Sequence, residues 1–368
     1  MNRIKWVDNL KGFILLLVCI GHLHYRSGWG LEVSSMCAAF RMTTFLFLSG
    51  YLFSVRRHAT FSSYLKSKTK SLLVPYICLS VVFSFLDLRL YDVSLIPRHR
   101  YTNYLILSHL GVPETIQNSL QYLYLEFVNI FISGTSTPIT TPLWFVNVLF
   151  WSSLLFYLVH HSCKGNKIVI LLYAILCISI GWICNKGHYF LPFNFHVVFS
   201  GSFYFSMGYI AHDFIKNKLH QLSSISLFLL LIPIFLIYLY GINVNGAISL
   251  YTNSLGGKLY GLLISSLSGI FMVITFFILI SRIPRTSLIG GLFRNLARNA
   301  LIFLAMHYFI IITSDTLFPQ YSRLTSFKNI VLIAALVISF ISFPLFRNKL
   351  YWLLGKKKIS VKESLSLE

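Results

Sequence analysis

The sequence predicts an all-α membrane protein: a polytopic bundle of about ten transmembrane helices with both termini in the cytoplasm. Of its 368 residues, 56% are hydrophobic and only 11% are charged, and the mean hydropathy is +0.72. Soluble domains carry roughly 25% charged residues. The apolar runs are long and continuous rather than alternating, which selects spanning helices over the strands of a membrane barrel.

Ten apolar segments are long enough to cross a bilayer, which takes roughly 20 residues. They cover residues 7–25, 36–54, 71–90, 143–160, 168–184, 193–214, 225–242, 258–281, 299–315 and 328–346. We therefore expect a single membrane domain over residues 1–368, without a separate soluble domain. The longest loop, 91–142, contains an amphipathic stretch at 120–132 and ends in a Gly, Thr and Pro cluster that is typical of an ordered or lid-like loop.

The basic residues set the orientation of this bundle. With the N-terminus inside, 21 of the 31 Lys and Arg residues fall on the cytoplasmic side and 8 on the outer side, as the positive-inside rule requires. The net charge of +21 lies in the loops between spans, so it indicates membrane topology and no nucleic-acid partner. We predict a multi-pass protein of the cell membrane (an inner or plasma membrane), with the lipid bilayer as its first partner.

The first span carries three ionisable side chains, Asp8, Lys11 and His22. Such residues are costly in a bilayer and are functional candidates for that reason. Lys11 and His22 are 11 residues apart, which places them within about 20° on one helix face and roughly 16 Å apart along it. Asp8 precedes Lys11 by three residues and can pair with it. Two alternatives stay open, in which Lys11 extends to the inner interface and His22 merely ends the helix.

Other spans add polar groups at a similar depth. Arg41, in the second span, needs an anionic or carbonyl partner if it is buried; the alternative is that it snorkels outward. We expect Ser49 and Gly50 to permit close helix packing.

The fourth and ninth spans contribute the remaining polar candidates. The fourth begins with Trp144, typical of an interfacial aromatic belt, and Asn147 follows one turn deeper. The ninth contains Asn295, Asn299 and His307. One arrangement that the sequence allows is a shared cavity lined by His22, Arg41, Asn147 and His307.

Several short motifs occur in an order that resembles a known family. They are Trp6-Val-Asp-Asn-Leu-Lys-Gly12, Val18-Cys-Ile-Gly-His22, the segment Phe45–Phe53, Leu143-Trp-Phe145, and Leu296-Ala-Arg-Asn-Ala-Leu301 followed by His307. Together they resemble membrane acyltransferase family 3, and most closely its branch of fucose 4-O-acetylase-like, capsule and O-antigen O-acetyltransferases. Thr43, Arg41 and Ala300 depart from the pattern of that branch, which bears on the acceptor more than on the reaction.

The resemblance implies transfer of an acyl group, usually acetyl from cytoplasmic acetyl-CoA, to a hydroxyl of an extracytoplasmic glycan such as O-antigen, capsule or exopolysaccharide. His22 would be the general base or, as a variant, an acyl-accepting nucleophile, supported by Asp8 and Lys11. Substrate-binding and oxyanion-stabilising roles would fall to Arg41, Trp144, Asn147, Asn299 and His307. Acetyl-CoA is then a substrate, and we expect no bound cofactor and no metal.

Cations on the cytoplasmic side are candidates for binding the CoA phosphates. They are Arg56, Arg57, Lys66 and Lys70 after the second span, and Arg282, Arg285, Arg294 and Arg298 around the ninth. The alternative for each is the positive-inside bias alone.

Two other functions remain open at this stage. A transporter or flippase would use the intramembrane His, Lys and Arg residues as a proton relay. A non-catalytic assembly partner of glycan synthesis would depend on none of them individually. The oligomeric state is not fixed by the sequence.

Overall fold

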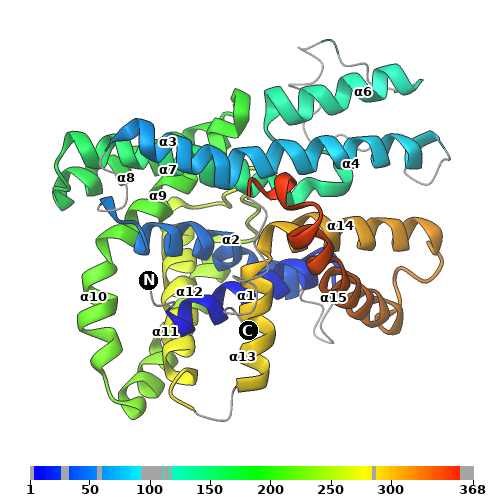
Figure 1. Ribbon diagram of the computed structural model, residues 1–368. Coiled ribbons are helices and arrows are strands. Elements are labelled where there is room, and N and C mark those ends of the chain that lie inside the picture. Colours follow the sequence, from blue (N-terminus) through cyan, green and yellow to red (C-terminus); the bar gives the residue numbers. More distant parts are fainter. Residues whose placement is uncertain are drawn as a thin grey trace. The chain divides into compact units, whose positions relative to one another are not determined.

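The computed structural model describes residues 4–25, 33–55, 60–92, 111, 116, 118–283 and 287–356, and these are the residues discussed below (Figure 1). All regular elements in these ranges are helices, with an isolated bridge between Ser249 and Ser254. The all-α class predicted from the sequence is therefore confirmed.

The chain divides into two compact units, each made from two stretches of sequence: residues 1–61 with 151–300, and residues 62–150 with 301–368. The first contains α1 (Lys5–His22), α2 (Val33–Tyr51), α8 (Lys167–Lys186), α9 (Phe195–Ile210), α10 (His212–Asn217), α11 (Ser224–Asn245), α12 (Leu259–Ile280) and α13 (Ser287–Arg298). The second contains α3 (Phe61–Lys68), α4 (Val74–Asp92), α6 (Ser119–Val128), α14 (Ala300–Leu317) and α15 (Thr325–Asn348). Helix α7 (Trp144–Ser162) belongs to both. The predicted single domain stays a prediction.

Within the described residues, seven helical segments are long and apolar enough to cross a membrane: Phe61–Leu90, Ser119–Ser162, Lys167–Lys186, Ser224–Asn245, Leu259–Ile280, Ala300–Leu317 and Thr325–Asn348. This agrees with a polytopic helical bundle. The other three predicted spans correspond to α1, α2 and α9. These three helices are shorter or less apolar than the seven. Helix α1 carries Lys5, Asp8 and Lys11, α2 carries Arg41 among several Ser and Thr residues, and α9 has only 16 residues.

Local sequence signals explain where several helices begin. The side chain of Asn166 accepts hydrogen bonds from Ile168 N and Val169 N at the start of α8, and Ser223 accepts one from Ser226 N at the start of α11. Asn118 caps α6 in the same way. These caps satisfy amide groups that the first turn of a helix leaves without intrahelical partners.

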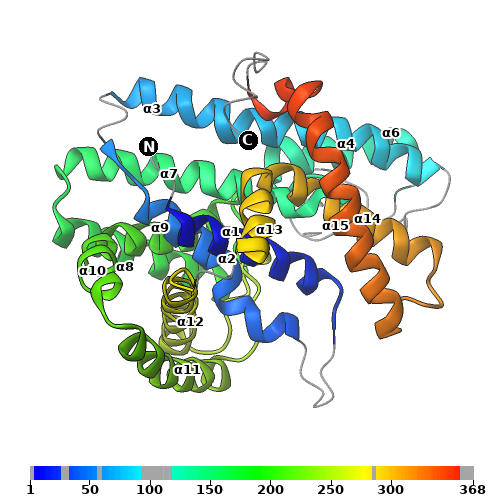
Figure 2. The same cartoon turned by 60° about the horizontal axis from the view of Figure 1, so that its bottom comes forward.

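Helix packing in the first unit depends on small residues at the contacts. Helices α11 and α12 lie side by side (Figure 2), while α2 packs on α9 through a reciprocal pair of glycines. A Cβ at Gly50 would lie 1.8 Å from the carbonyl oxygen of Phe205, and a Cβ at Gly208 would lie 1.9 Å from that of Phe47. The predicted packing role of Gly50 is confirmed. The Ser49 hydroxyl bonds its own helix, at Phe45 O.

We predict that Gly50→Ala and Gly208→Ala each destabilise the protein by about 1–3 kcal/mol, because either methyl group would force two backbones apart. The measurement is thermal unfolding of the purified protein in detergent. Gly291→Ala on α13 is the matched control, since a Cβ there meets nothing within 4 Å. If all three variants melt alike, the close contact between α2 and α9 is wrong.

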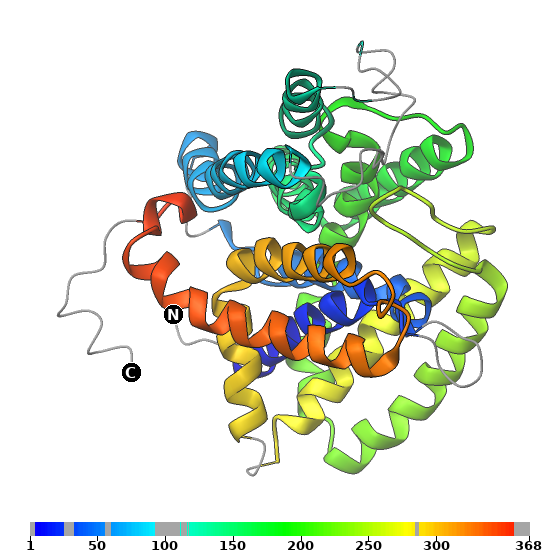
Figure 3. The ribbon, with the colours of Figure 1, turned by 90° about the vertical axis from the view of Figure 1, so that its right-hand side faces the viewer.

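Two connections differ in detail from the sequence prediction. The predicted ninth span, 299–315, corresponds to α14 (Ala300–Leu317), which contains His307 and leads through a short connection to α15 (Figure 3). Asn295, which the sequence assigned to the same helix, lies instead in α13, and Asn299 stands between the two helices. At this junction the side-chain amide of Asn299 donates to Asn295 O and Oδ1, at 3.0 and 2.9 Å. The amphipathic stretch 120–132 is helical, formed by α6 and the π-helical turn η3 (Asn129–Ser133).

The Gly, Thr and Pro cluster at 134–142 is ordered, as predicted, and largely buried within the second unit. Most of it forms the 3-10 helix η4 (Pro138–Leu143), which runs directly into α7. Ser136 anchors the cluster to α4, since its hydroxyl lies 2.7 Å from that of Ser80 and its amide donates to Tyr76 Oη at 3.2 Å. This segment therefore fixes the direction in which the first turn of α7 begins.

Candidate functional site

Helix α1 holds the three ionisable residues on which the sequence interpretation depends. Asp8 lies in its first turn and His22 is its last residue, positions at which the helix dipole favours an acid and a base respectively. Asp8, Lys11 and His22 are all half-buried. Lys11 and His22 lie on one continuous helix, as the sequence predicted. Their spacing of 11 residues places both side chains on one face of α1, which we call the Lys11–His22 seam.

Arg41 of α2 reaches across to the C-terminal part of α1. Its Nη1 donates to Leu17 O at 3.2 Å, and the guanidinium covers Gly21 so closely that a Cβ there would lie 1.7 Å from Nη1. Arg41 thus has the carbonyl partner that a buried arginine needs. Its Nε is buried and has no hydrogen-bond partner among the described residues. The guanidinium that covers Gly21, the residue before His22, thus has a buried N–H group to which no described residue is bonded.

The N-terminal end of α1 packs on α13. A Cβ at Gly12 would lie 2.0 Å from Phe293 O, and Arg294 Nη1 donates to Asn9 Oδ1 at 3.4 Å. Arg298 is exposed at the end of the same helix. The contact places Arg294 on the Asn9 face of the N-terminal end of α1, roughly 160° round the helix from Lys11.

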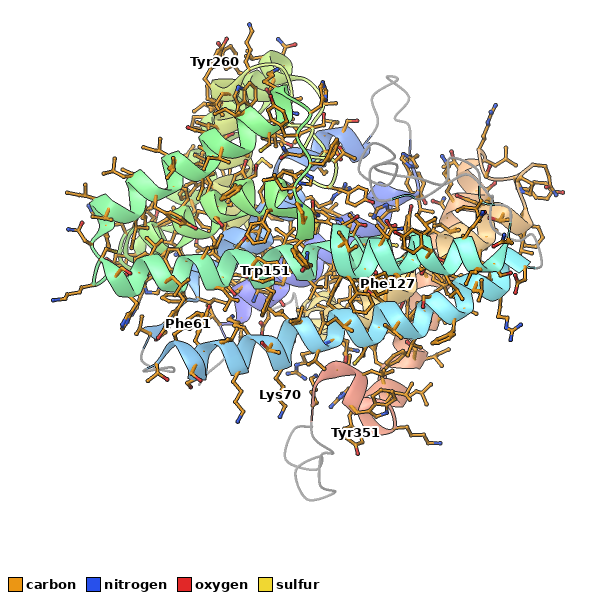
Figure 4. The ribbon with its side chains drawn as sticks, turned by 90° about the horizontal axis from the view of Figure 1, so that it is seen from above. Phe61, Lys70, Phe127, Trp151, Tyr260 and Tyr351 are labelled. Carbon is orange, nitrogen blue, oxygen red and sulfur yellow. The ribbon has the colours of Figure 1, made fainter. Side chains whose placement is uncertain are left out.

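The other candidates for CoA phosphates have different surroundings. Arg282 donates to the carbonyl oxygens of Leu222 and His220, both at 2.7 Å. This guanidinium therefore holds the segment before α11, a structural role that needs no phosphate. Lys66 and Lys70 are exposed on the second unit, and Lys70 projects from its helix (Figure 4). Arg56, Arg57 and Arg285 lie outside the described residues.

The predicted residues of the second unit are buried and bonded. Trp144 is only 5% exposed, which does not fit a ring in an aromatic belt facing lipid; it packs edge-on against Phe145. Asn147 Nδ2 donates to Gly134 O at 3.3 Å. His307 is fully buried, with Nδ1 2.6 Å from Phe303 O and its ring stacked on that of Phe303. The shared cavity with His22 and Arg41 stays a prediction.

An apolar pocket of about 340 Å³ lies on α1, but it belongs to another face of the helix. It is lined by Phe13, Leu17, Cys37, Phe40, Leu231, Phe235, Met272, Val273 and Phe276. At 100° per residue, Phe13 and Leu17 lie roughly 120–180° round the helix from Lys11 and His22. An acyl donor extended along the Lys11–His22 seam would therefore not enter this pocket.

The sequence interpretation missed an acidic pair in the second unit. Asp87 of α4 is fully buried and Glu126 of α6 is 2% exposed, although the chain has only 10 acidic residues. Asp87 lies inside the predicted span 71–90, which was a usable signal because an intramembrane carboxyl group is rare. Glu126 lies in the segment assigned to a loop, so nothing in the sequence connected the two.

These features define a multi-pass membrane protein with an ionisable seam along its first helix. A family model described as an acyltransferase domain matches residues 4–346. The chain therefore belongs to membrane acyltransferase family 3. No curated protein and no solved structure matches it significantly.

Proposed function

We propose that the protein moves an acetyl group from cytoplasmic acetyl-CoA to a hydroxyl of an extracytoplasmic glycan. The observation that supports this most directly is the contact at the C-terminal end of α1, where the Arg41 guanidinium covers Gly21, the residue before His22, and its buried Nε has no hydrogen-bond partner among the described residues. Acyl transfer needs a base for the acceptor hydroxyl and a donor for the carbonyl oxygen as it becomes negative. His22 would supply the base, and Arg41, which covers the preceding residue Gly21, would supply the donor.

In the proposed reaction, His22 accepts the proton of the acceptor hydroxyl as that oxygen attacks the thioester carbonyl carbon. A C–O bond forms, the C–S bond breaks, and the proton passes to the leaving thiolate. Arg41 stabilises the oxyanion of the tetrahedral intermediate. Lys11, on the seam, and Arg294, which Asn9 holds on another face at the same end of α1, attract the polar groups and phosphates of the donor.

The test uses the purified full-length protein in proteoliposomes with acetyl-labelled acetyl-CoA and surface glycan extracted from the host cell. We expect label to become ester-linked to the glycan only when the protein is present. A transporter or flippase would move glycan or solute across the bilayer without forming an ester, and an assembly partner would do neither. Mass spectrometry of surface glycan from cells with and without the gene would then identify the acceptor and the acyl group.

A further inference from the structure

The second unit contains a polar stripe that the proposed reaction does not use. Tyr76, Ser80, Ser84 and Asp87 recur every three or four residues on α4, within roughly 80° of one another round the helix. At its far end the two oxygens of Asp87 are both acceptors. Oδ1 accepts from Tyr122 Oη at 2.8 Å and Oδ2 from Ile139 N at 3.4 Å.

Glu126 faces this carboxyl group from α6. It lies one turn after Tyr122, and its carboxyl is within hydrogen-bond reach of Asp87. Both Glu126 oxygens are buried and meet no hydrogen-bond donor among the described residues. A buried acceptor without a donor costs stability, and two carboxylates in contact away from water repel each other strongly.

No basic side chain among the described residues neutralises the pair. On α4, Arg89 and Asp92 are exposed, and Asp92 accepts from Ser119. The hydroxyl of Tyr122 already donates to Asp87. Lys70 and Tyr351 lie toward the opposite end of α4 (Figure 4). Helix α14 meets α4 through Phe309 on Phe83, and the segment 134–143 brings no titratable side chain.

We propose that Asp87 and Glu126 form a binding site for one proton, in which Glu126 is the carboxylic acid and donates to the Asp87 carboxylate. The assignment follows from the donors. Asp87 already accepts two hydrogen bonds, as a carboxylate does. No described group donates to Glu126, but a protonated Glu126 can itself donate one hydrogen bond. The shared proton removes the repulsion and gives Glu126 its missing bond.

The site connects three elements of the second unit. Through Tyr122 and Ile139, Asp87 joins α4 to α6 and to η4, which runs into Trp144 at the start of α7. Asn147 bonds Gly134 at the other end of the same segment. Loss of the proton therefore loosens the segment that positions Trp144 and Asn147. The consequence for acyl transfer rests on the proposed function: the rate of transfer falls as the pH of the outer medium rises.

The test compares wild type with Glu126→Gln and Asp87→Asn, using the purified full-length protein in detergent. Infrared spectra at neutral pH should show a carboxylic-acid carbonyl band that is present in wild type and lost in Glu126→Gln. Asp92→Asn, an exposed carboxyl on the same helix, is the control and should leave the band unchanged.

Thermal unfolding gives an independent readout. The folded state keeps the proton, while the unfolded chain releases it above the ordinary carboxyl range, about pH 4; stability therefore falls as pH rises. Wild type should melt at a lower temperature at about pH 9 than at about pH 5. This dependence of the melting temperature on pH should be reduced in Glu126→Gln and retained in Asp92→Asn. Asp87→Asn should melt at a lower temperature at every pH. The NH₂ group that replaces one carboxylate oxygen cannot accept a hydrogen bond, so the bond from Tyr122 or the bond from Ile139 is lost.

Each contrary result overturns the proposal. Absence of the acid band in wild type would mean that both carboxyls are ionised, and an unaltered pH slope in Glu126→Gln would place the proton elsewhere. Stabilisation by Na⁺ in place of acidity would make the site a cation site. These readouts do not depend on acyl transfer, so absence of transfer in every variant would reject the proposed function and leave the proton site standing.

Discussion

Replacing His22 with alanine is expected to lower acyl transfer to the glycan by about 10²–10⁴-fold, the usual contribution of a positioned general base. His22 is the last residue of α1 and is half-buried, so truncation removes an imidazole from a helix end without opening a fully buried core. We therefore expect the loss in the rate at saturating donor rather than in the amount of folded protein. The measurement is labelled acetyl transfer at equal amounts of protein.

The matched control is His24→Asn, two residues later. His24 is exposed and has a φ of 50°, a backbone conformation that asparagine tolerates well. It should retain transfer. If His22→Ala also retains full transfer, His22 is not the base. Retention of label on the wild-type protein in the absence of acceptor, and its loss in His22→Ala, would instead favour the acyl-histidine variant.

The helices were the most predictable part of this molecule because each is encoded by a continuous apolar run. The segments predicted at 225–242 and 258–281 correspond to α11 (Ser224–Asn245) and α12 (Leu259–Ile280), whose boundaries are marked by polar caps and Gly or Lys residues. The packing role of Gly50 also followed from residue size alone. The segment predicted at 299–315 likewise corresponds to α14 (Ala300–Leu317), although apolar content does not show that Asn299 bonds back to Asn295.

The chemistry of the site was only partly predictable, for a physical reason. Lys11 and His22 are neighbours on one helix, so periodicity relates them directly. The contact of Arg41 with Gly21, and that of Tyr122 with Asp87 at a separation of 35 residues, depend on tertiary packing. Composition could have drawn attention to Asp87 as an acid in an apolar span, but its partners on α6 and η4 come from another part of the chain.

The contact between Gly21 and Arg41 gives the second large effect. In Gly21→Ala the added methyl would lie 1.7 Å from Arg41 Nη1, so the guanidinium must leave its place, lose its bond to Leu17 O and withdraw its free Nε–H from the site. We expect transfer to fall by about 10²-fold, as for removal of one oxyanion donor. Arg41→Ala should fall by a similar factor. Gly291→Ala, which meets nothing within 4 Å, is the control.

The double variant Gly21→Ala, Arg41→Ala decides whether the two changes act through one group. If the methyl works by displacing the guanidinium, the double variant loses no more activity than Arg41→Ala alone, because contacting residues that share one function are not additive. Independent, multiplied losses would mean that Gly21→Ala disturbs His22 directly through the end of α1, and that Arg41 acts elsewhere. The cycle thus separates a positioned oxyanion donor from an arginine that only packs two helices together.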